Sequence, residues 1–253
     1  MALVFIDLDG TALNKGQPAV GVIESIKALR KNNHKVAIAT GRSPVVLYDK
    51  GKLLGIDHLV LANGGYVISK GDIIYERYIP NNIVKRIMNF VDEIETDLVI
   101  EYLDIYVSYR KDTDVADRFS DIFQIEKPIF DNNHYPNRKV FSMVVFDNER
   151  IDQMIDAFPE LEFNKTHALG YDVNLRGELK AKGVKELVKH LKYPEDEVYA
   201  IGDGFNDITM IKSAKYGIAM GNAVQELKDV ADFVTTDVND YGIMNALKHY
   251  KLI

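Results

Sequence analysis

The sequence predicts an α/β protein in which a doubly wound, Rossmann-like parallel sheet is interrupted by an inserted α+β domain. In the N-terminal third, and again after about residue 178, short β-branched runs alternate with amphipathic segments, a pattern typical of parallel βα units. Between residues 81 and 178 this alternation stops and the segment turns acidic, with 20 Asp and Glu against 11 Lys and Arg. We therefore predict a core domain of residues 1–80 and 179–253 and an α+β domain of residues 81–178.

The N-terminal third contains the clearest strand of the chain. Leu3–Leu8 is an almost unbroken apolar run, as expected of a strand that is covered on both faces. In residues 18–33, Val22, Ile26 and Leu29 recur at helical spacing. The further elements predicted here are strands at Lys35–Thr40 and His58–Asn63, a short helix around Pro44–Leu54, and a hairpin whose arms are Tyr66–Ile68 and Ile73–Tyr75.

The middle segment predicts helices and an antiparallel sheet. One helix presents an apolar face of Ile83, Ile87, Phe90 and Ile94. Leu98–Tyr109 and Lys139–Asp147 are expected to be half-exposed strands, with helices between and after them. After residue 178 the alternation returns, and the predicted elements are helices at Lys182–Leu191, Phe205–Ala214, Ala223–Val230 and Tyr241–His249 and strands at Glu197–Ile201, Tyr216–Met220 and Phe233–Thr235.

The composition excludes several classes of function. The chain contains no Cys, which excludes disulfides, thiolate metal sites and a cysteine nucleophile. The net charge of −7 and the sequence pI near 5.4 argue against binding to nucleic acid or to an anionic membrane. No apolar run approaches the length of a membrane span or resembles a signal peptide, so we expect a cytoplasmic protein.

Two acidic clusters follow predicted buried strands. Asp7 and Asp9 stand with Gly10 at the carboxyl end of the first strand, where open α/β sheets bind their ligands. Asp203, Asn206 and Asp207 follow a later strand in the same way. Because the carboxyl ends of parallel strands share one edge, the two clusters can converge, and like charges so close favour a hard cation such as Mg²⁺. The alternative interpretation is structural: acidic residues at these positions would also be found in solvated turns or as helix caps.

Two further segments could hold a phosphoryl group. Thr40 and Gly41 stand at the end of the second strand, and Lys180 and Lys182 stand at the start of a helix. A hydroxyl beside backbone N–H groups, together with an ammonium, can bind phosphoryl oxygens near a metal. Either segment alone is weak evidence, because such turns and helices are common.

Taken in order, these segments resemble the four motifs of the haloacid dehalogenase-like (HAD) phosphatase superfamily. The motifs read Asp-x-Asp-Gly-Thr from Asp7, Thr-Gly-Arg from Thr40, a lysine, and Gly-Asp-Gly-x-Asn-Asp from Gly202. The insertion after the second motif, preceded by Asn63-Gly64, resembles the Cof-type branch, in which a cap domain is inserted there. Lys180 precedes Asp203 by 23 residues, the spacing usual in the family, so we assign it to the third motif and keep Lys182 as the alternative.

The resemblance implies a mechanism and a role for each motif residue. Asp7 is expected to attack a phosphate monoester as nucleophile, and Asp9 to act as general acid and base. Mg²⁺ is expected on the Asp7 and Asp203 carboxylates and the Asp9 backbone carbonyl, with Asp207 in support. Four residues are expected to bind the phosphoryl group: Thr40, Gly41, Lys180 and Asn206. Arg42, at the domain junction, is a candidate for a residue that sets substrate specificity.

The expected activity is therefore Mg²⁺-dependent hydrolysis of small phosphorylated metabolites, such as sugar phosphates, through an aspartyl-phosphate. The inserted domain would act as a lid, and its acidity disfavours polyanionic substrates. No nucleic-acid or membrane partner is expected, and the protein should be a monomer or a weak homodimer. Two alternatives stay open: a phosphomannomutase-like phosphomutase on the same scaffold, and a catalytically silent regulatory or binding protein.

Overall fold

The computed structural model describes residues 1–44, 54–111, 114–123, 125–133, 138–167, 170–177 and 180–253. The chain divides into two compact units. The core unit comprises Met1–Gly41, Asp49–Glu76 and Leu179–Ile253, and the inserted unit comprises Arg42–Tyr48 and Arg77–Glu178. The predicted helix around Pro44–Leu54 lies almost wholly outside the described residues. We describe each unit by itself.

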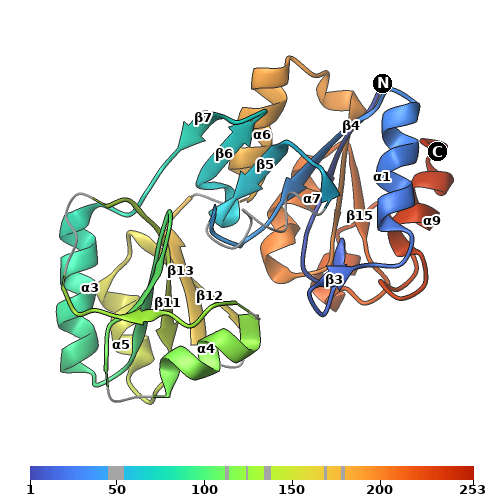
Figure 1. The fold of residues 1–253 in the computed structure, drawn as a ribbon. Coiled ribbons are helices and arrows are strands. Elements are labelled where there is room, and N and C mark those ends of the chain that lie inside the picture. Colours follow the sequence, from blue (N-terminus) through green and yellow to red (C-terminus); the bar gives the residue numbers. More distant parts are fainter. Residues whose placement is uncertain (45–53, 112–113, 124, 134–137, 168–169, 178–179) are drawn as a thin grey trace. The chain divides into compact units, whose positions relative to one another are not determined.

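The core unit is built on an eight-stranded sheet with the order β16-β15-β14-β1-β4-β5-β6-β7 (Figure 1). The six strands from β16 to β5 pair in parallel, and β6 and β7 add an antiparallel edge. The bounds are β1 Leu3–Ile6, β4 Lys35–Ala39, β5 His58–Leu61, β6 Tyr66–Ser69, β7 Asp72–Glu76, β14 Val198–Gly202, β15 Tyr216–Ala219 and β16 Phe233–Val234.

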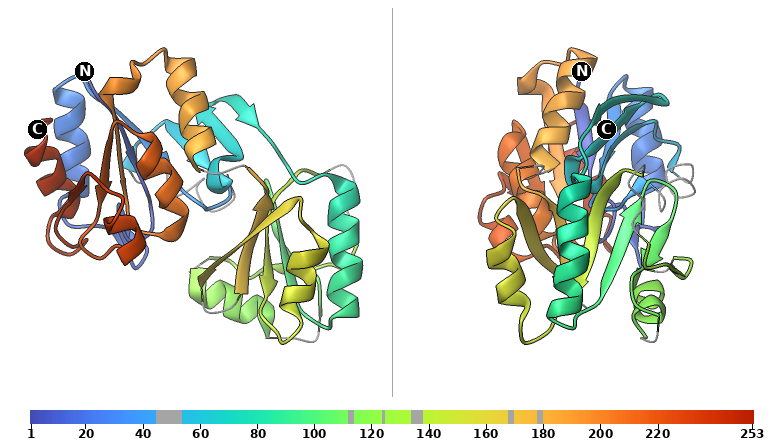
Figure 2. Two further views of the ribbon diagram at one scale, coloured as in Figure 1. Left: turned by 180° about the vertical axis from the view of Figure 1, so that it is seen from behind. Right: turned by 90° about the vertical axis from the view of Figure 1, so that its left-hand side faces the viewer.

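Helices cover both faces of this sheet, which makes it doubly wound. The helix α1 (Val22–Lys31) packs against β4 and α9 (Gly242–His249), whereas α6 (Lys180–Leu191) packs against β5 and β6, and α7 (Ile208–Ser213) against β14 and β15. Figures 1 and 2 show the two pairs on opposite sides of the strands. The short elements of this unit are β2 Leu13–Asn14, β3 Gln17–Pro18, α8 Gln225–Lys228 and the 3₁₀ turns η1 Ala62–Gly64, η2 Glu195–Glu197 and η3 Phe205–Asp207. Its α/β architecture confirms the predicted fold class.

The strand β1 is the centre of the sheet and the reason that the motifs converge. All four of its residues are buried, and it is hydrogen-bonded to β4 on one side and to β14 on the other. The three strands run parallel, so the residues that follow them stand at one edge of the sheet.

In the part of the chain that the structure describes, no helix is long and apolar enough to cross a bilayer.

The inserted unit is a six-stranded sheet with the order β10-β9-β8-β11-β13-β12. All neighbouring pairs are antiparallel except β9 and β10. The bounds are α3 Asn81–Glu93, β8 Leu98–Tyr102, β9 Tyr106–Ser108, α4 Val115–Phe123, β10 Ile129–Phe130, β11 Val140–Phe146, α5 Ile151–Ala157, β12 Leu161–His167 and β13 Gly170–Leu175. The apolar residues of α3 and α5 share one core with a face of this sheet, and α4 packs against the other face.

Two sequence-based expectations for this unit were wrong. Leu98–Tyr109 is two strands, β8 and β9, and both are buried, as is the whole of β11. The expectation of half-exposed strands failed because both faces of the sheet are covered. The helices α3 and α5 cover one face, and α4 packs against Val99, Val144 and Phe146 on the other. The hairpin of β12 and β13 was not predicted. Buried Ile79 pairs with Val140 and belongs to the core of this unit.

Among the described residues of the inserted unit, Glu101 is a buried carboxylic acid with a strongly altered pKa. Glu101 lies on β8, pairs with Tyr106 and Ser142 in the neighbouring strands, and is only 9% exposed. Burial raises the pKa of its carboxyl from 4.5 to about 8, and the nearby carboxylate of Asp172 contributes to the rise, whereas Arg42 opposes it. The carboxyl of Glu101 therefore holds its proton to a higher pH than an exposed glutamate does.

We expect the inserted unit to lose stability as the pH rises from about 5 to about 8. Over this range unfolded Glu101 releases its proton near the ordinary pKa of 4.5 while folded Glu101 keeps it, so the free energy of unfolding falls. The change should be on the order of a few kcal/mol and should be absent from Glu101→Gln. Hydrogen exchange of the β8 and β11 amides, compared with the variant at each pH, measures it. Exposed Glu93→Gln is the control, and a difference between Glu101→Gln and wild type that does not change with pH would contradict the assignment.

Candidate active site

Asp7 is placed by the continuation of strand pairing beyond β1. Its N–H donates a hydrogen bond to the carbonyl of Ile201 in β14 (2.9 Å), so the residue stays aligned with the neighbouring strand. The chain then turns back at once, because the carbonyls of Asp7 and Leu8 accept hydrogen bonds from the N–H groups of Ala12 and Leu13. The Asp7 side chain is 8% exposed. A carboxylate is thus held in a buried position at the edge of the sheet.

Asp203 approaches this turn from the end of β14. Its Oδ1 accepts a hydrogen bond from Thr11 Oγ1 (2.7 Å), which joins the first acidic cluster to the second. Gly10 has φ +79°, and a β-carbon there would lie 2.2 Å from Asp203 Oδ2. Only glycine satisfies both the left-handed backbone and this close approach.

Lys180, the first residue of α6, extends into the acidic cluster. Its Nζ lies 2.6 Å from Asp7 Oδ1 and 2.5 Å from Asp207 Oδ1, and its side chain is fully buried. Lys182, two residues further along the helix, pairs instead with Glu186 at 2.8 Å and is largely exposed. Residues two apart on a helix point in different directions, so only one of these lysines can reach the cluster.

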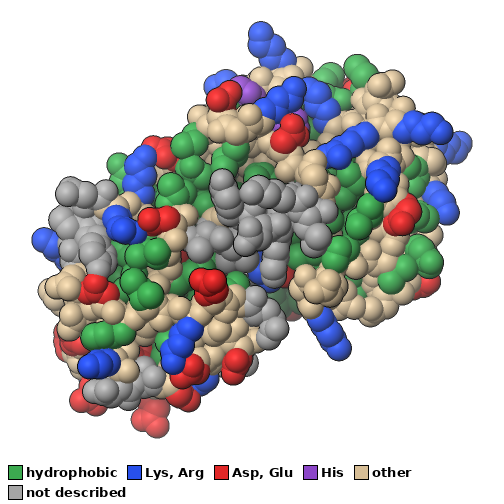
Figure 3. Space-filling view, viewed as in Figure 1, with side chains coloured by type: hydrophobic (Ala, Val, Ile, Leu, Met, Phe, Trp, Pro, Cys, Tyr) green, Lys and Arg blue, Asp and Glu red, His purple; other side chains and the backbone are tan. Residues whose placement is uncertain are grey.

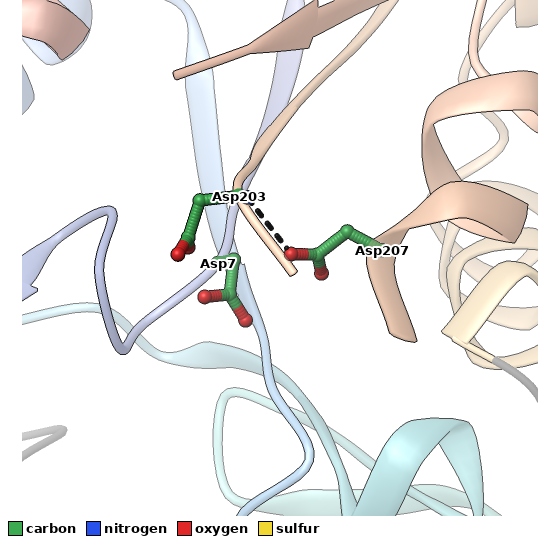
Figure 4. Close-up of side chains that lie close together, drawn as sticks. All are labelled: Asp7, Asp203 and Asp207. Carbon is green, nitrogen blue, oxygen red and sulfur yellow. Dashed lines mark hydrogen bonds between the residues drawn. The ribbon is translucent and has the colours of Figure 1, made fainter. Parts of the chain in front are cut away.

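Asp207 completes a group of three carboxylates. Its Oδ2 accepts hydrogen bonds from the N–H groups of Asp203 (3.0 Å) and Gly204 (2.9 Å), which ties the loop after β14 into a tight turn. One carboxylate oxygen from each of Asp7, Asp203 and Asp207 lies within 4.8 Å of the others. Figure 4 shows the Asp207 side chain directed toward the other two.

The electrostatics of the cluster favour an added cation. Burial, the carboxylate of Asp207 and that of Asp203 raise the pKa of Asp7 well above its usual range, against the lowering effect of Lys180. Burial is also the main cause that raises the pKa of Asp203 to about 6. Burial alone would lower the pKa of Lys180, but Asp207 and Asp7 raise it overall, so the lysine is a cation. One ammonium does not neutralise three carboxylates, and a divalent cation would.

The remaining predicted residues come from the ends of neighbouring strands. Thr40 follows β4, is 2% exposed, and donates its N–H to the carbonyl of Val60 (2.9 Å). Gly41 comes next, and Asn206 lies in η3. Asn206 Nδ2 donates a hydrogen bond to Asn63 Oδ1 (3.0 Å), and both side chains pass close to Gly41.

The structure adds contacts that the sequence did not predict for Thr11 and Asn63, and it places Asp9 and Arg42 outside the carboxylate cluster. Thr11 belongs to the first motif but was assigned no role, although it bonds Asp203 directly. In the sequence, Asn63 stands out only as part of the Asn63-Gly64 pair, and no other local feature predicts its contact with Asn206. Asp9, predicted to offer its carbonyl to the metal, has an exposed side chain outside the three-carboxylate group. Arg42 groups with the inserted unit.

Comparison with known proteins identifies the family. The family model of the haloacid dehalogenase-like hydrolases matches residues 4–247. The chain belongs to the haloacid dehalogenase-like hydrolases. This confirms the resemblance seen in the sequence motifs, and it makes the cluster of Asp7, Lys180 and Asp203 the candidate active site of a HAD-like enzyme.

Individual relatives agree with this family. The Bacillus subtilis protein YkrA, named provisionally as a phosphatase, is 32% identical, with 99% of this chain and 98% of the relative covered. A solved structure of a Geobacillus kaustophilus protein has a TM-score of 0.93 and 32% identity over 100% of this chain and 99% of its own. The HAD subclass IIB sugar phosphatase BT4131 has a TM-score of 0.89 and 27% identity, with both chains fully covered. The HAD-like chain is thus a phosphatase.

Proposed function

We propose that this phosphatase hydrolyses small phosphate monoesters, sugar phosphates among them, in a Mg²⁺-dependent reaction that passes through an aspartyl-phosphate, the acyl phosphate of Asp7. The observation that carries the proposal is the buried Asp7 carboxylate, which Lys180 holds at the carboxyl edge of the sheet beside Asp203 and Asp207. Open α/β sheets bind their ligands at this edge, and phosphoryl transfer needs such a combination of a nucleophile with positive charge.

The donor set fits Mg²⁺. Carboxylate and carbonyl oxygens are the ligands that this ion prefers, and the three carboxylates carry more negative charge than Lys180 compensates. We assign the carboxylates of Asp7 and Asp203 and the backbone carbonyl of Asp9 as its protein ligands. Asp207 fixes the backbone of Asp203 by accepting its N–H. When bound, Mg²⁺ neutralises charge on the phosphoryl group that is transferred.

In the first step, a carboxylate oxygen of Asp7 attacks phosphorus and the bond from phosphorus to the alkoxide breaks. Lys180 donates a hydrogen bond to Oδ1 of Asp7 and so holds the carboxylate in position for the attack. Asp9 donates a proton to the departing alkoxide, and its exposed position lets the leaving group reach it. The products of this step are the free alcohol and the acyl phosphate of Asp7.

In the second step, Asp9 accepts a proton from water as that water attacks phosphorus. The bond from phosphorus to Asp7 breaks, which releases inorganic phosphate and restores both carboxyl groups. During both steps the Thr40 hydroxyl, the Gly41 N–H, the Lys180 ammonium and the Asn206 amide bind the phosphoryl oxygens. These donors follow β4 and β14 or begin α6, so rigid elements hold them in position.

The acidity of the inserted unit supports a substrate with little charge beyond its single phosphate. Residues 81–178 hold nine more acidic than basic residues. On the face drawn in Figure 3, acidic side chains gather over the inserted unit, whereas basic side chains are prominent over the core unit. A polyanionic leaving group would be repelled, and a polyol would not. The likeness to a sugar phosphatase supports the same substrate class.

A phosphomutase would use the same nucleophile but return the phosphoryl group to the sugar. A silent binding protein would need none of the acid–base equipment, whereas Asp7, Asp9, Lys180 and Asp203 are all present. Partners other than a small metabolite, the oligomeric state and the cellular compartment stay predictions from the sequence.

A panel of phosphate monoesters tests the proposal. We expect release of inorganic phosphate with Mg²⁺, loss of that release in EDTA, and recovery on readdition of the metal. Hexose monophosphates should be hydrolysed faster than the corresponding bisphosphates, because the acidic unit disfavours the second phosphate. Phosphate release is measured colorimetrically, and hexose phosphate isomers are separated by chromatography.

Each alternative has its own outcome in this experiment. Full activity in EDTA would contradict the role of the metal. Isomerisation of a hexose phosphate that exceeds its hydrolysis would identify a phosphomutase. No phosphate release from any ester by the folded, Mg²⁺-loaded protein would leave the binding-protein alternative.

A further inference from the structure

Asn63 occupies a backbone conformation that few residues adopt. It lies in η1, directly after β5, with φ 49° and ψ 36°, and its neighbour Ala62 also has a positive φ of 48°. Asparagine tolerates this left-handed region better than other residues with a β-carbon. The residue is only 5% exposed, so its carboxamide is directed into the protein rather than into solvent.

The carboxamide and backbone of Asn63 join three segments that are distant in the sequence. Its N–H donates to the carbonyl of Thr40 (3.1 Å), at the end of β4. Its Oδ1 accepts from Nδ2 of Asn206 (3.0 Å), in the loop after β14. A β-carbon at Gly41 would lie 2.9 Å from Asn63 Oδ1 and 3.1 Å from Asn206 Nδ2, so the amide pair fills the space beside this glycine.

The hydrogen bond fixes the direction of the Asn206 side chain. An amide nitrogen carries two hydrogens and a carboxamide oxygen carries none. Because Asn63 accepts one hydrogen of Asn206 Nδ2, the carboxamide of Asn206 cannot rotate to exchange its nitrogen and oxygen without losing this bond. The second hydrogen of Nδ2 stays available to another acceptor.

We propose that Asn63 is a positioning residue that orients Asn206, and the adjacent Thr40-Gly41 segment, for binding of the phosphoryl group. This inference rests on the proposed function, which assigns Thr40, Gly41 and Asn206 to the phosphoryl oxygens. Asn63 acts through Asn206 and does not itself touch the substrate. It keeps the donor hydrogen, instead of the amide oxygen, directed at the phosphate.

The test removes the carboxamide without changing the backbone. Asn63→Gly tolerates the left-handed conformation, and Asn63→Ala is a second variant that removes the same carboxamide but keeps the β-carbon. We expect both variants to raise KM for a phosphate monoester, and the inhibition constant of inorganic phosphate, by about tenfold while kcat changes by less than about threefold. The control is Asn33→Gly, at an exposed asparagine with φ 61°, which should leave both constants unchanged.

A double-mutant cycle distinguishes positioning from a general structural effect. Asn206→Ala should raise KM by a similar factor, and Asn63→Gly should add little in that background, because its route to the phosphate is already removed. Asn63 variants with a wild-type KM, or effects that multiply in the double mutant, would overturn the inference. If Asn206→Ala itself leaves KM unchanged, it is the assignment of Asn206 under the proposed function that fails.

Discussion

Replacing Asp7 with asparagine should reduce phosphate release by on the order of 10⁴-fold or more while the protein stays folded. Asparagine has the same shape as aspartate and keeps an oxygen to accept the hydrogen bond from Lys180. Its amide is not a nucleophile at phosphorus, so the first step of the proposed reaction is lost. Steady-state release of inorganic phosphate measures the effect, and circular dichroism verifies the fold.

The same substitution should raise thermal stability in the absence of metal. Asp7 is crowded by the carboxylates of Asp207 and Asp203, and removing one of these three like charges relieves that repulsion. Added Mg²⁺ should then stabilise wild type more than the variant. Exposed Asp9→Asn is the matched comparison: it should lower activity by about 10²–10⁴-fold without the gain in stability. Substantial residual activity in Asp7→Asn would rule out Asp7 as the nucleophile.

Replacing Lys180 with methionine should reduce both stability and activity. Methionine keeps the apolar stem but removes the charge that pairs with Asp7 and Asp207. Breaking a buried ion pair from one side costs about 3–5 kcal/mol, because the remaining charges are left uncompensated. Loss of a donor to the phosphoryl group should also lower kcat by about 10²–10³-fold. Chemical denaturation without metal and phosphate release with Mg²⁺ measure the two effects.

Lys182→Met provides the matched control on the same helix. Its partner Glu186 is a surface residue one helical turn away, and exposed pairs of this kind contribute less than about 1 kcal/mol. The variant should therefore resemble wild type in both measurements. A larger loss of activity at Lys182 than at Lys180 would reverse the assignment of the third motif.

The chain order of strands and helices in the core unit was predictable because its patterns are local. The strand β1 is buried on both faces and appears in the sequence as a continuous apolar run. Acidic residues directly after β1 and β14 could be expected to meet, since parallel strands bring their carboxyl ends to one edge. The same reasoning placed Thr40 near them, after β4.

The inserted unit was less predictable because its burial depends on packing between distant segments. Glu101 on β8 and Ser142 on β11 are polar residues in buried strands, and locally they are indistinguishable from residues of a solvent-facing edge. The hairpin of β12 and β13 contains polar residues such as Asn164 and Asp172 opposite each other, which weakened the apolar signal of a strand.

By itself the sequence determined the family, the α/β core and the set of chemically competent residues, because these depend on residue type and on spacing along one chain. Only the tertiary structure decided which groups touch. It paired Thr11 with Asp203, and it paired Asn63 with Asn206 across 143 positions. Such contacts form because the pairing of parallel strands into one sheet brings strand ends together, and no local periodicity in the sequence relates these ends to each other.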